Sequence, residues 1–250
     1  MVCLALVKHM SEKSQIPLVI ITGASQGIGA AIAQCFANAE FPVRLALLAR
    51  NKAALEQVAL NCTGADDLAC YAVDVSDEQQ VLDFAQNLQR DMGDASVLIN
   101  NAGCWHGATV ADMSAADFDR IIAVNLRSTF LMSRMVLPAM LQRQYGDIFN
   151  MSSTAGFEGY AGVSAYCAAK HAVSGFTKAL REEVGGKGIR VSCVSPGPTY
   201  SPSWHSSGIA KEQFMPAEDV ARAFLEIYRM DRNVVVEDIV LRPQAGHISS

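Results

Sequence analysis

The sequence predicts an α/β fold, in which one doubly wound, mostly parallel sheet of seven strands carries helices on both faces. Short apolar runs rich in β-branched residues alternate with helical patterns along the chain, which is typical of parallel strands joined by crossover helices. A length of 250 residues, half of them hydrophobic, favours one large domain over two small ones. We therefore expect a single domain over residues 1–250.

The first predicted strand, Pro17–Ile21, leads directly into a glycine-rich turn and then into a helix of small residues. The turn reads Thr22-Gly23-Ala24-Ser25-Gln26-Gly27-Ile28-Gly29. Such a turn forms an anion site, because free backbone N–H groups and the helix dipole both point at it. We expect Gly23, Gly27 and Gly29 to accommodate a diphosphate, although a turn of this kind also occurs without a ligand.

The second predicted strand, Phe41–Ala49, ends at Arg50, and Asn51 is a good N-cap for a helix over Lys52–Leu60. A dinucleotide fold that prefers NAD usually has an acidic side chain here for the adenosine ribose, whereas an arginine suits the 2′-phosphate of NADP. Arg50 therefore favours NADP(H), with NAD(H) as the second choice. The alternative is that Arg50 only flanks the helix start.

Polar residues follow the next predicted strands. Leu68–Val73 ends in Asp74, whose carboxylate either accepts a hydrogen bond from an adenine amino group or only forms a turn. Ser96–Ile99 is closed by Asn100-Asn101-Ala102-Gly103. The remaining predicted strands are Asp147–Ser152, Ile189–Ser195 and Asn233–Leu241. Since ligands of a doubly wound sheet bind at the carboxyl ends of its strands, we expect these motifs to meet at one edge.

A helix predicted to begin at Ser114, with Asp117 as its capping partner, carries Asn125 inside an apolar stripe. Burying an amide costs free energy unless the amide is hydrogen-bonded. Asn125 is therefore either a satisfied structural amide or a functional one, and the sequence leaves both interpretations open.

The stretch from Ser153 to Lys170 holds a hydroxyl, a phenol and an ammonium. A helical pattern begins at Ser164, so Tyr166 and Lys170 stand one turn apart on one helix face. A nearby ammonium favours the phenolate, and we therefore expect Lys170 to lower the pKa of Tyr166 from its usual value of about 10. Such a pair could exchange protons near neutral pH. The alternative is an ordinary surface pair on an amphipathic helix.

Two segments lie outside the regular pattern. The 198–215 segment is rich in Ser, Pro and Gly and is predicted to form a substrate lid, in which Trp204 and His205 either contact the substrate or only lie on the surface. Residues 1–15 are predicted to form a flexible N-terminal extension without the features of a signal peptide.

Composition excludes several classes of function. A net charge of −5 without a basic run gives no reason to expect nucleic acid or an anionic membrane as a partner. The seven cysteines show neither a disulfide framework nor a metal-binding spacing, so we expect no metal and a reduced, cytoplasmic protein. No stretch is long and apolar enough to predict a bilayer span.

Taken together and in this order, the motifs resemble those of the short-chain dehydrogenase/reductase family from about Pro17 to Pro243. The matching residues are Thr22-Gly-x-x-x-Gly-Ile-Gly29, Asp74, Asn100-Asn-Ala-Gly103, Asn125, Ser153, Tyr166-x-x-x-Lys170 and Pro196-Gly197. The resemblance implies a Rossmann-type fold and an NADP(H)-dependent oxidoreductase that interconverts a carbonyl and a secondary alcohol.

The resemblance also implies a role for each catalytic residue. Tyr166 would donate a proton to the substrate oxygen or remove one, and Ser153 would hold that oxygen by a hydrogen bond. Lys170 would bind the nicotinamide ribose and lower the pKa of Tyr166. Asn125 would hold a water that relays protons to solvent. The hydride would come from the cofactor.

The expected cofactor contacts lie along the carboxyl edge. Gln26 departs from the basic residue that many NADP-binding members carry in the glycine turn, which leaves Arg50 as the main candidate for the 2′-phosphate, with Ser25 assisting. Ser201 replaces a threonine of the family. The full set is Gly23, Ser25, Gln26, Gly27, Ile28, Gly29, Arg50, Asn51, Asp74, Val75, Asn101, Ala102, Gly103, Tyr166, Lys170, Pro196, Gly197 and Ser201.

For the substrate, a small carbonyl compound or alcohol, we expect contacts from Ser153, Trp105, Trp204 and His205. The resemblance also implies a homodimer or homotetramer in which the helices around Asn125 and Tyr166 pair with copies from other subunits. Two alternatives stay open: an inactive dinucleotide-binding sensor or scaffold, and a lyase or epimerase that recycles its cofactor.

Overall fold

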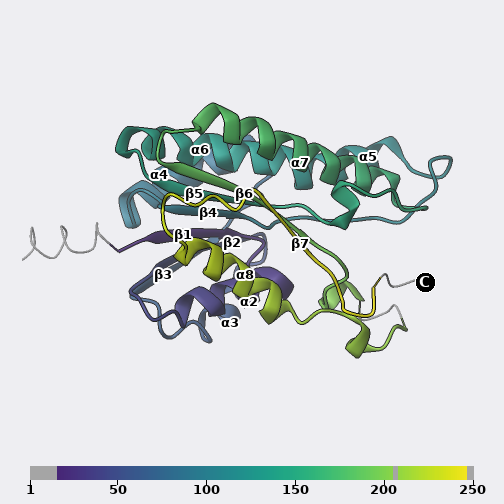
Figure 1. Ribbon diagram of the computed structural model, residues 1–250, viewed down its shortest axis with the longest axis horizontal. Helices are drawn as coiled ribbons and strands as arrows, with labels where there is room; N and C mark the ends of the chain where they lie inside the picture. The colour runs from purple at the N-terminus through teal and green to yellow at the C-terminus, as the bar shows by residue number, and fades with distance from the viewer. Residues whose placement is uncertain (1–15, 205–207, 247–250) are drawn as a thin grey trace, which may run out of the picture.

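A computed structural model describes residues 16–204 and 208–246, so the predicted extension over 1–15 and the candidate His205 lie outside the described residues. The chain forms one seven-stranded sheet with helices on both faces, in the strand order β3-β2-β1-β4-β5-β6-β7 (Figure 1). Every pairing between neighbouring strands is parallel, so the sheet is wholly rather than mostly parallel. The strands are β1 (Leu18–Thr22), β2 (Arg44–Ala49), β3 (Asp67–Ala72), β4 (Val97–Asn100), β5 (Gly146–Met151), β6 (Ile189–Pro196) and β7 (Asp238–Leu241).

Two helical layers cover the sheet (Figure 1). One consists of α2 (Gly27–Ala37), α3 (Lys52–Ala59) and α8 (Ala217–Arg229), and the other of α4 (Glu78–Asp91), α5 (Ala115–Ile122), α6 (Ser128–Arg143) and α7 (Ser164–Val184). Leu18, Val19, Ile20 and Ile21 of β1 are completely buried, because side chains on both faces of a central parallel strand pack against helices. The continuous apolar run of this strand is therefore explained by its position.

Two helices, α3 and α5, begin at the capping residues that the sequence indicates. The Asn51 side chain accepts a hydrogen bond from the N–H of Ala54, and the Ser114 hydroxyl accepts one from the N–H of Asp117. Between α5 and α6 the chain passes through a π-helical turn, η1 (Ala123–Arg127), instead of a break. Such turns occur often at functional sites, and this one carries Asn125. The short 3₁₀ segments are η2 (Thr154–Gly156), η3 (Pro202–Trp204) and η4 (Lys211–Gln213).

The seventh strand is shorter than predicted. The sequence indicates a strand over Asn233–Leu241, but β7 begins only at Asp238. The backbone before it turns, with the N–H of Val234 donating to the carbonyl of Asp231. The Arg190 guanidinium donates to the carbonyls of Met230 and Asp231, which satisfies this turn without a ladder.

Buried charge closes the amino edge of the sheet. The Asp147 carboxylate, at the start of β5, accepts hydrogen bonds from Arg190 and Arg232. Arg190 also donates to the carbonyl of Tyr228 at 2.8 Å, so the guanidinium of the Asp147–Arg190 ion pair has a further hydrogen bond. In the described part of the chain, no helix combines the length and the apolar character that crossing a membrane requires.

Candidate active site

The glycines of the turn lie where a side chain would meet neighbouring atoms. A Cβ on Gly29 would lie 2.3 Å from the carbonyl oxygen of Gly23, and one on Gly23 would lie 2.9 Å from the Cα of Ala102. Gly23 also has a φ of +65°, which disfavours other residues. The Gln26 side chain makes no capping hydrogen bond to α2. The turn is therefore a cradle of open backbone at a helix N-terminus, and this fits the diphosphate of a dinucleotide.

Thr22 joins this cradle to the loop after β4. Its Oγ1 accepts hydrogen bonds from the backbone N–H groups of Asn101 at 3.0 Å and Ala102 at 2.9 Å. The Asn101 side chain in turn donates to the carbonyl of Thr22 at 2.9 Å. Asn101 and Ala102 thus have structural partners within the protein. The sequence analysis included Thr22 in the glycine motif but gave its hydroxyl no role, although a hydroxyl at a strand end beside glycine was a visible signal.

Among the residues expected to contact the adenosine, some are exposed and others are hydrogen-bonded within the protein. Arg50 is exposed, whereas the Asn51 side chain is committed to capping α3. The Asp74 carboxylate accepts hydrogen bonds from the N–H of Ser76 at 2.9 Å and from its hydroxyl at 2.6 Å. Asp74 thus forms a turn through its Oδ1, and its contact with an adenine stays a prediction; Val75 beside it is buried.

Helix α7 and strand β5 bring a lysine, a tyrosine and a serine together. The Lys170 side chain is 3% exposed, its Nζ donates to the carbonyl of Met151 at 2.9 Å, and it lies 5.6 Å from the centre of the Tyr166 ring. The Ser153 hydroxyl is hydrogen-bonded to the Tyr166 phenol. The residues expected to act together are therefore in contact, and the surface-pair alternative is wrong because Lys170 is buried.

The pKa of Tyr166 differs from the sequence-based expectation. Burial raises the pKa of Tyr166 to about 12, and the hydrogen bond from Ser153 only partly opposes this. Burial also lowers the pKa of Lys170 to about 8. In the protein without a ligand the pKa of Tyr166 therefore lies above its usual value and not below it as expected, because burial disfavours the phenolate. Tyr166 thus stays protonated.

Asn125 presents one unpartnered atom. Its side chain is 1% exposed, and its Nδ2 donates to the carbonyls of Cys104 at 2.7 Å and Ile121 at 2.9 Å. Its Oδ1 is buried without a hydrogen-bond partner. A Cβ on Gly103 would lie 2.8 Å from this oxygen and 3.6 Å from the Lys170 Nζ. Asn125 is structural through its Nδ2, while its Oδ1 remains open to a further donor.

Ser201 and Pro202, in the 198–215 segment, lie beside the glycine-rich turn at Gly27. The ends of this segment are held together by the hydrogen bonds from Tyr200 N–H to the Met215 carbonyl and from Met215 N–H to the Pro198 carbonyl. A Cβ on Gly27 would lie 3.2 Å from the Cβ of Ser201. Before the segment, Pro196 ends β6, and the N–H of Gly197 donates to the carbonyl of Leu241 at 2.7 Å.

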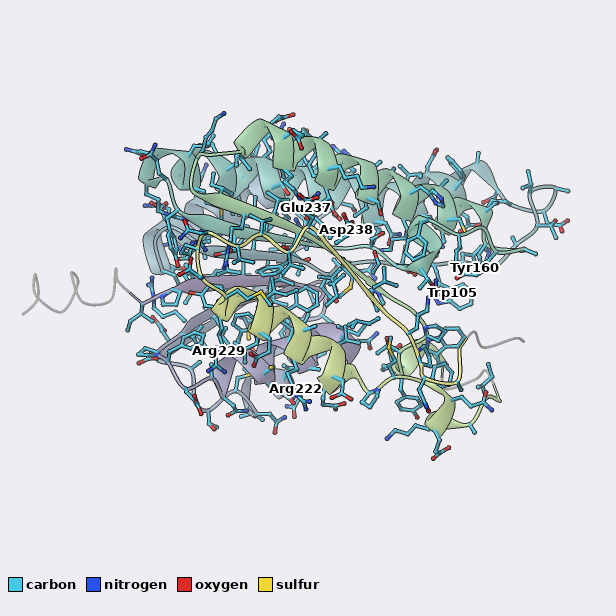
Figure 2. The ribbon with its side chains drawn as sticks, viewed as in Figure 1. Trp105, Tyr160, Arg222, Arg229, Glu237 and Asp238 are labelled. Carbon is cyan, nitrogen blue, oxygen red and sulfur yellow. The ribbon has the colours of Figure 1, made fainter. Side chains whose placement is uncertain are left out.

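Two residues of the predicted substrate site meet although they are far apart in the sequence. The rings of Trp105, from the loop after β4, and Trp204, from η3, are stacked with centroids 6.4 Å apart. Figure 2 shows Trp105 at the end of the molecule that also carries Tyr160. Sequence reasoning missed Tyr160, whose hydroxyl donates to the Glu158 carboxylate and is hydrogen-bonded to the Thr154 hydroxyl at 3.0 Å beside Ser153. No residue spacing signalled it.

Two further features lie apart from these residues. A hollow of about 400 Å³ lies between the end of the 198–215 segment, the start of α8 and the chain after β7, and Phe214, Leu241 and Arg242 are among its lining residues. It includes none of Asn125, Ser153, Tyr166 and Lys170. Among the described residues, no group of three or more His, Cys, Asp or Glu side chains could hold a metal ion.

Comparison with known sequences identifies relatives over most of the chain. The sequence model of the family described as short chain dehydrogenase matches residues 17–212. A sepiapterin reductase of Chlorobaculum tepidum is 31% identical over 238 residues, which cover 92% of this chain and 98% of that protein. An uncharacterized oxidoreductase of Staphylococcus saprophyticus is 29% identical over 228 residues, covering 90% of this chain and 97% of that protein.

Solved structures agree with the sequence comparison. A metagenomic short-chain oxidoreductase in complex with NADP is 31% identical with a TM-score of 0.78, covering 91% of this chain and 97% of that one. An alcohol dehydrogenase of the archaeon Thermococcus sibiricus, complexed with 5-hydroxy-NADP, has a TM-score of 0.85 at 24% identity, covering 94% and 100%. The second likeness shows the shared fold alone. With its glycine cradle, its buried lysine beside a tyrosine and these relatives, the chain belongs to the short-chain dehydrogenase/reductase family of NAD(P)-dependent oxidoreductases.

Proposed function

We propose that this protein is an NADP(H)-dependent oxidoreductase that interconverts a carbonyl and a secondary alcohol, with Tyr166 as the general acid and base. The observation that carries the proposal is the placement of a half-buried, protonated phenol in contact with the Ser153 hydroxyl and next to the buried Lys170. A phenol whose pKa is about 12 retains its proton until a developing alkoxide requires it.

Ser153, Lys170 and Asn125 each have a separate role in this reaction. The Ser153 hydroxyl holds the substrate oxygen next to the Tyr166 phenol and keeps the carbonyl oriented. Lys170 carries a positive charge below its pKa of about 8, and this charge stabilises negative charge that develops on Tyr166 during proton transfer. The open Oδ1 of Asn125 accepts a hydrogen bond from a donor near Lys170.

The cradle and its surroundings would hold the cofactor. NADPH supplies the hydride when it is bound. The backbone at Gly23 and the N-terminus of α2 would bind the diphosphate, and the exposed Arg50 guanidinium would bind the 2′-phosphate, which distinguishes NADP from NAD. A solved structure that is 31% identical to this chain and carries NADP supports this preference.

We also propose a homodimer or homotetramer. Phe118 of α5 and Phe130 of α6 are 42% and 43% exposed, and an exposed phenylalanine costs free energy unless another surface covers it. Light scattering coupled to size-exclusion chromatography measures the assembly. Exchange of both phenylalanines for serine is expected to dissociate it, and a monomeric wild-type protein would contradict this proposal.

The exchange Tyr166→Phe tests the proposed function. We expect it to reduce the turnover of ketones and aldehydes about 10²- to 10⁴-fold, which is the usual contribution of a positioned acid, while the Kd of NADPH changes little. Stopped-flow absorbance of NADPH measures the first quantity and fluorescence titration the second. As the matched control, Tyr145→Phe removes a hydroxyl at the far edge of the sheet and should leave both values unchanged. Near-normal turnover in Tyr166→Phe would contradict the role of Tyr166.

A further inference from the structure

Both tryptophans of the chain lie in one aromatic cluster, although they are about a hundred positions apart. The Trp105 and Trp204 rings stack at 6.4 Å with 25° between their planes. Trp204 packs against Phe214 at 5.0 Å, and Phe214 packs against Tyr200 at 6.0 Å. These distances lie in the range of direct ring contact. We call these four residues the aromatic wall.

The aromatic wall begins next to the catalytic residues. Gly103 lies beside Asn125 and Lys170, since a Cβ added to it would lie 2.8 Å from the Asn125 Oδ1 and 3.6 Å from the Lys170 Nζ. The following residue, Cys104, packs in the same apolar cluster as Tyr166, and Trp105 comes directly after it. The loop then pairs with the chain that leads into α7, since the N–H of Ala108 donates to the carbonyl of Gly162 at 2.8 Å. Trp105 therefore lies on a loop that packs beside Tyr166 and the start of α7.

Trp105, at one end of the aromatic wall, leaves a large apolar surface in contact with water. Trp105 is 48% exposed, whereas Phe214, which supports Trp204 from behind, is 6% exposed. A half-exposed indole that stacks on the partly buried ring of Trp204 gains free energy from any flat apolar group that covers it.

We infer that Trp105 and Trp204 form a subsite for the ring of the substrate, and that the substrate is a flat, conjugated carbonyl compound. This inference rests on the proposed function, because it extends from the carbonyl that Tyr166 and Ser153 would hold. The ring attached to that carbonyl lies along the exposed face of Trp105. The subsite thus selects aryl ketones and cyclic conjugated ketones over aliphatic ones.

The first test compares two activated dicarbonyls, the fused aromatic isatin and the aliphatic diacetyl. We expect Trp105→Ala to lower kcat/KM for isatin about tenfold or more while kcat/KM for diacetyl stays within about twofold. Trp105→Phe keeps a ring and should recover most of the loss. Because Trp105 is half exposed, neither exchange removes a core residue, and the diacetyl activity reports whether the protein has folded. Equal losses for both substrates, or no loss for either, would overturn the inference.

The second test needs no turnover. Since the chain has only two tryptophans and both belong to the aromatic wall, intrinsic tryptophan fluorescence reports on this wall alone. Oxindole, a flat ring without a reducible ketone, should change this fluorescence in the NADP-bound protein, whereas the saturated valerolactam should not. A response to oxindole in a protein that reduces no carbonyl would support the subsite and reject the proposed function. Carbonyl reduction without any response to oxindole would reject the subsite alone.

Discussion

The two edges of the sheet hold buried charge in opposite ways. At the amino edge, the Asp147 carboxylate is 1% exposed and has two arginine partners, Arg190 and Arg232. At the carboxyl edge, Lys170 is buried to a similar degree, and the structure gives its Nζ one hydrogen bond, to the Met151 carbonyl. The Asn125 Oδ1 near it has no partner. The buried charge at the amino edge thus has oppositely charged partners, whereas the buried polar groups at the carboxyl edge have fewer hydrogen bonds than they can form.

The buried ion pairs of Asp147 therefore stabilise the fold, whereas Lys170 and Asn125 keep hydrogen-bonding capacity for a ligand. Removing one partner of a buried, hydrogen-bonded ion pair strongly destabilises a protein, because the remaining charge is left buried without compensation. A buried charge with incomplete hydrogen bonding destabilises the protein as it stands, and the lowered pKa of Lys170 measures this cost. Exchanges at the two edges should therefore change the free energy of unfolding with opposite signs.

The largest expected effect lies at the amino edge. We expect Asp147→Asn to lower the free energy of unfolding by about 3 to 5 kcal/mol, because it leaves the buried Arg190 without its counter-charge. Urea denaturation followed by circular dichroism measures the change. The control Asp219→Asn breaks an exposed pair with Arg222 and should change stability by less than about 1 kcal/mol. Equal effects of the two exchanges would remove the distinction between the edges.

A smaller effect of opposite sign is expected for Lys170. Lys170→Met replaces an incompletely bonded buried cation by an apolar side chain of similar volume, and we expect a gain of about 1 to 4 kcal/mol in the free energy of unfolding without ligand. The same exchange should abolish turnover. A loss of stability in the same denaturation experiment would show that Lys170 is a structural charge like Asp147.

The pH dependence sharpens this prediction. The pKa of Lys170 is about 8 in the folded protein and about 10.5 in the unfolded chain, so the unfolded chain binds more protons between these values. Wild-type stability should therefore receive a contribution from Lys170 that rises with pH from about 8 to 10.5. The advantage of Lys170→Met should shrink over this window and stay constant below it. An advantage that does not depend on pH would contradict the assigned pKa.

The smallest expected effect on stability comes from Arg50. Because Arg50 is exposed, Arg50→Ala should change the free energy of unfolding by less than about 0.5 kcal/mol. It should nevertheless weaken NADPH binding about tenfold or more, because a charged hydrogen bond to the 2′-phosphate is lost, while the Kd of NADH changes little. Isothermal titration measures both constants. Arg222→Ala on α8 (Figure 2) is the matched control, and equal weakening of NADH binding would contradict the 2′-phosphate contact.

Local signals predicted most of the fold. The burial of β1 follows from its apolar run, and the starts of α3 and α5 follow from Asn51 and Ser114, because capping depends on residues three positions away. The length of β7 could not be predicted, since Arg190, about 40 positions earlier, holds the turn that replaces its first half. The glycine cradle was predictable as a motif, but the contact between Gly23 and Ala102 was not.

The sequence by itself determined which chemical groups stand at the carboxyl edge, because strand period, helix period and glycine spacing are local properties of the chain. Only the tertiary structure decided the pKa values of these groups and which of them are in contact. The pKa values of Tyr166 and Lys170 depend on how far packing excludes water, and the pairing of Trp105 with Trp204 depends on two loops that meet only after the sheet has formed. Desolvation and distant contacts are sums over the whole fold, so no local pattern encodes them.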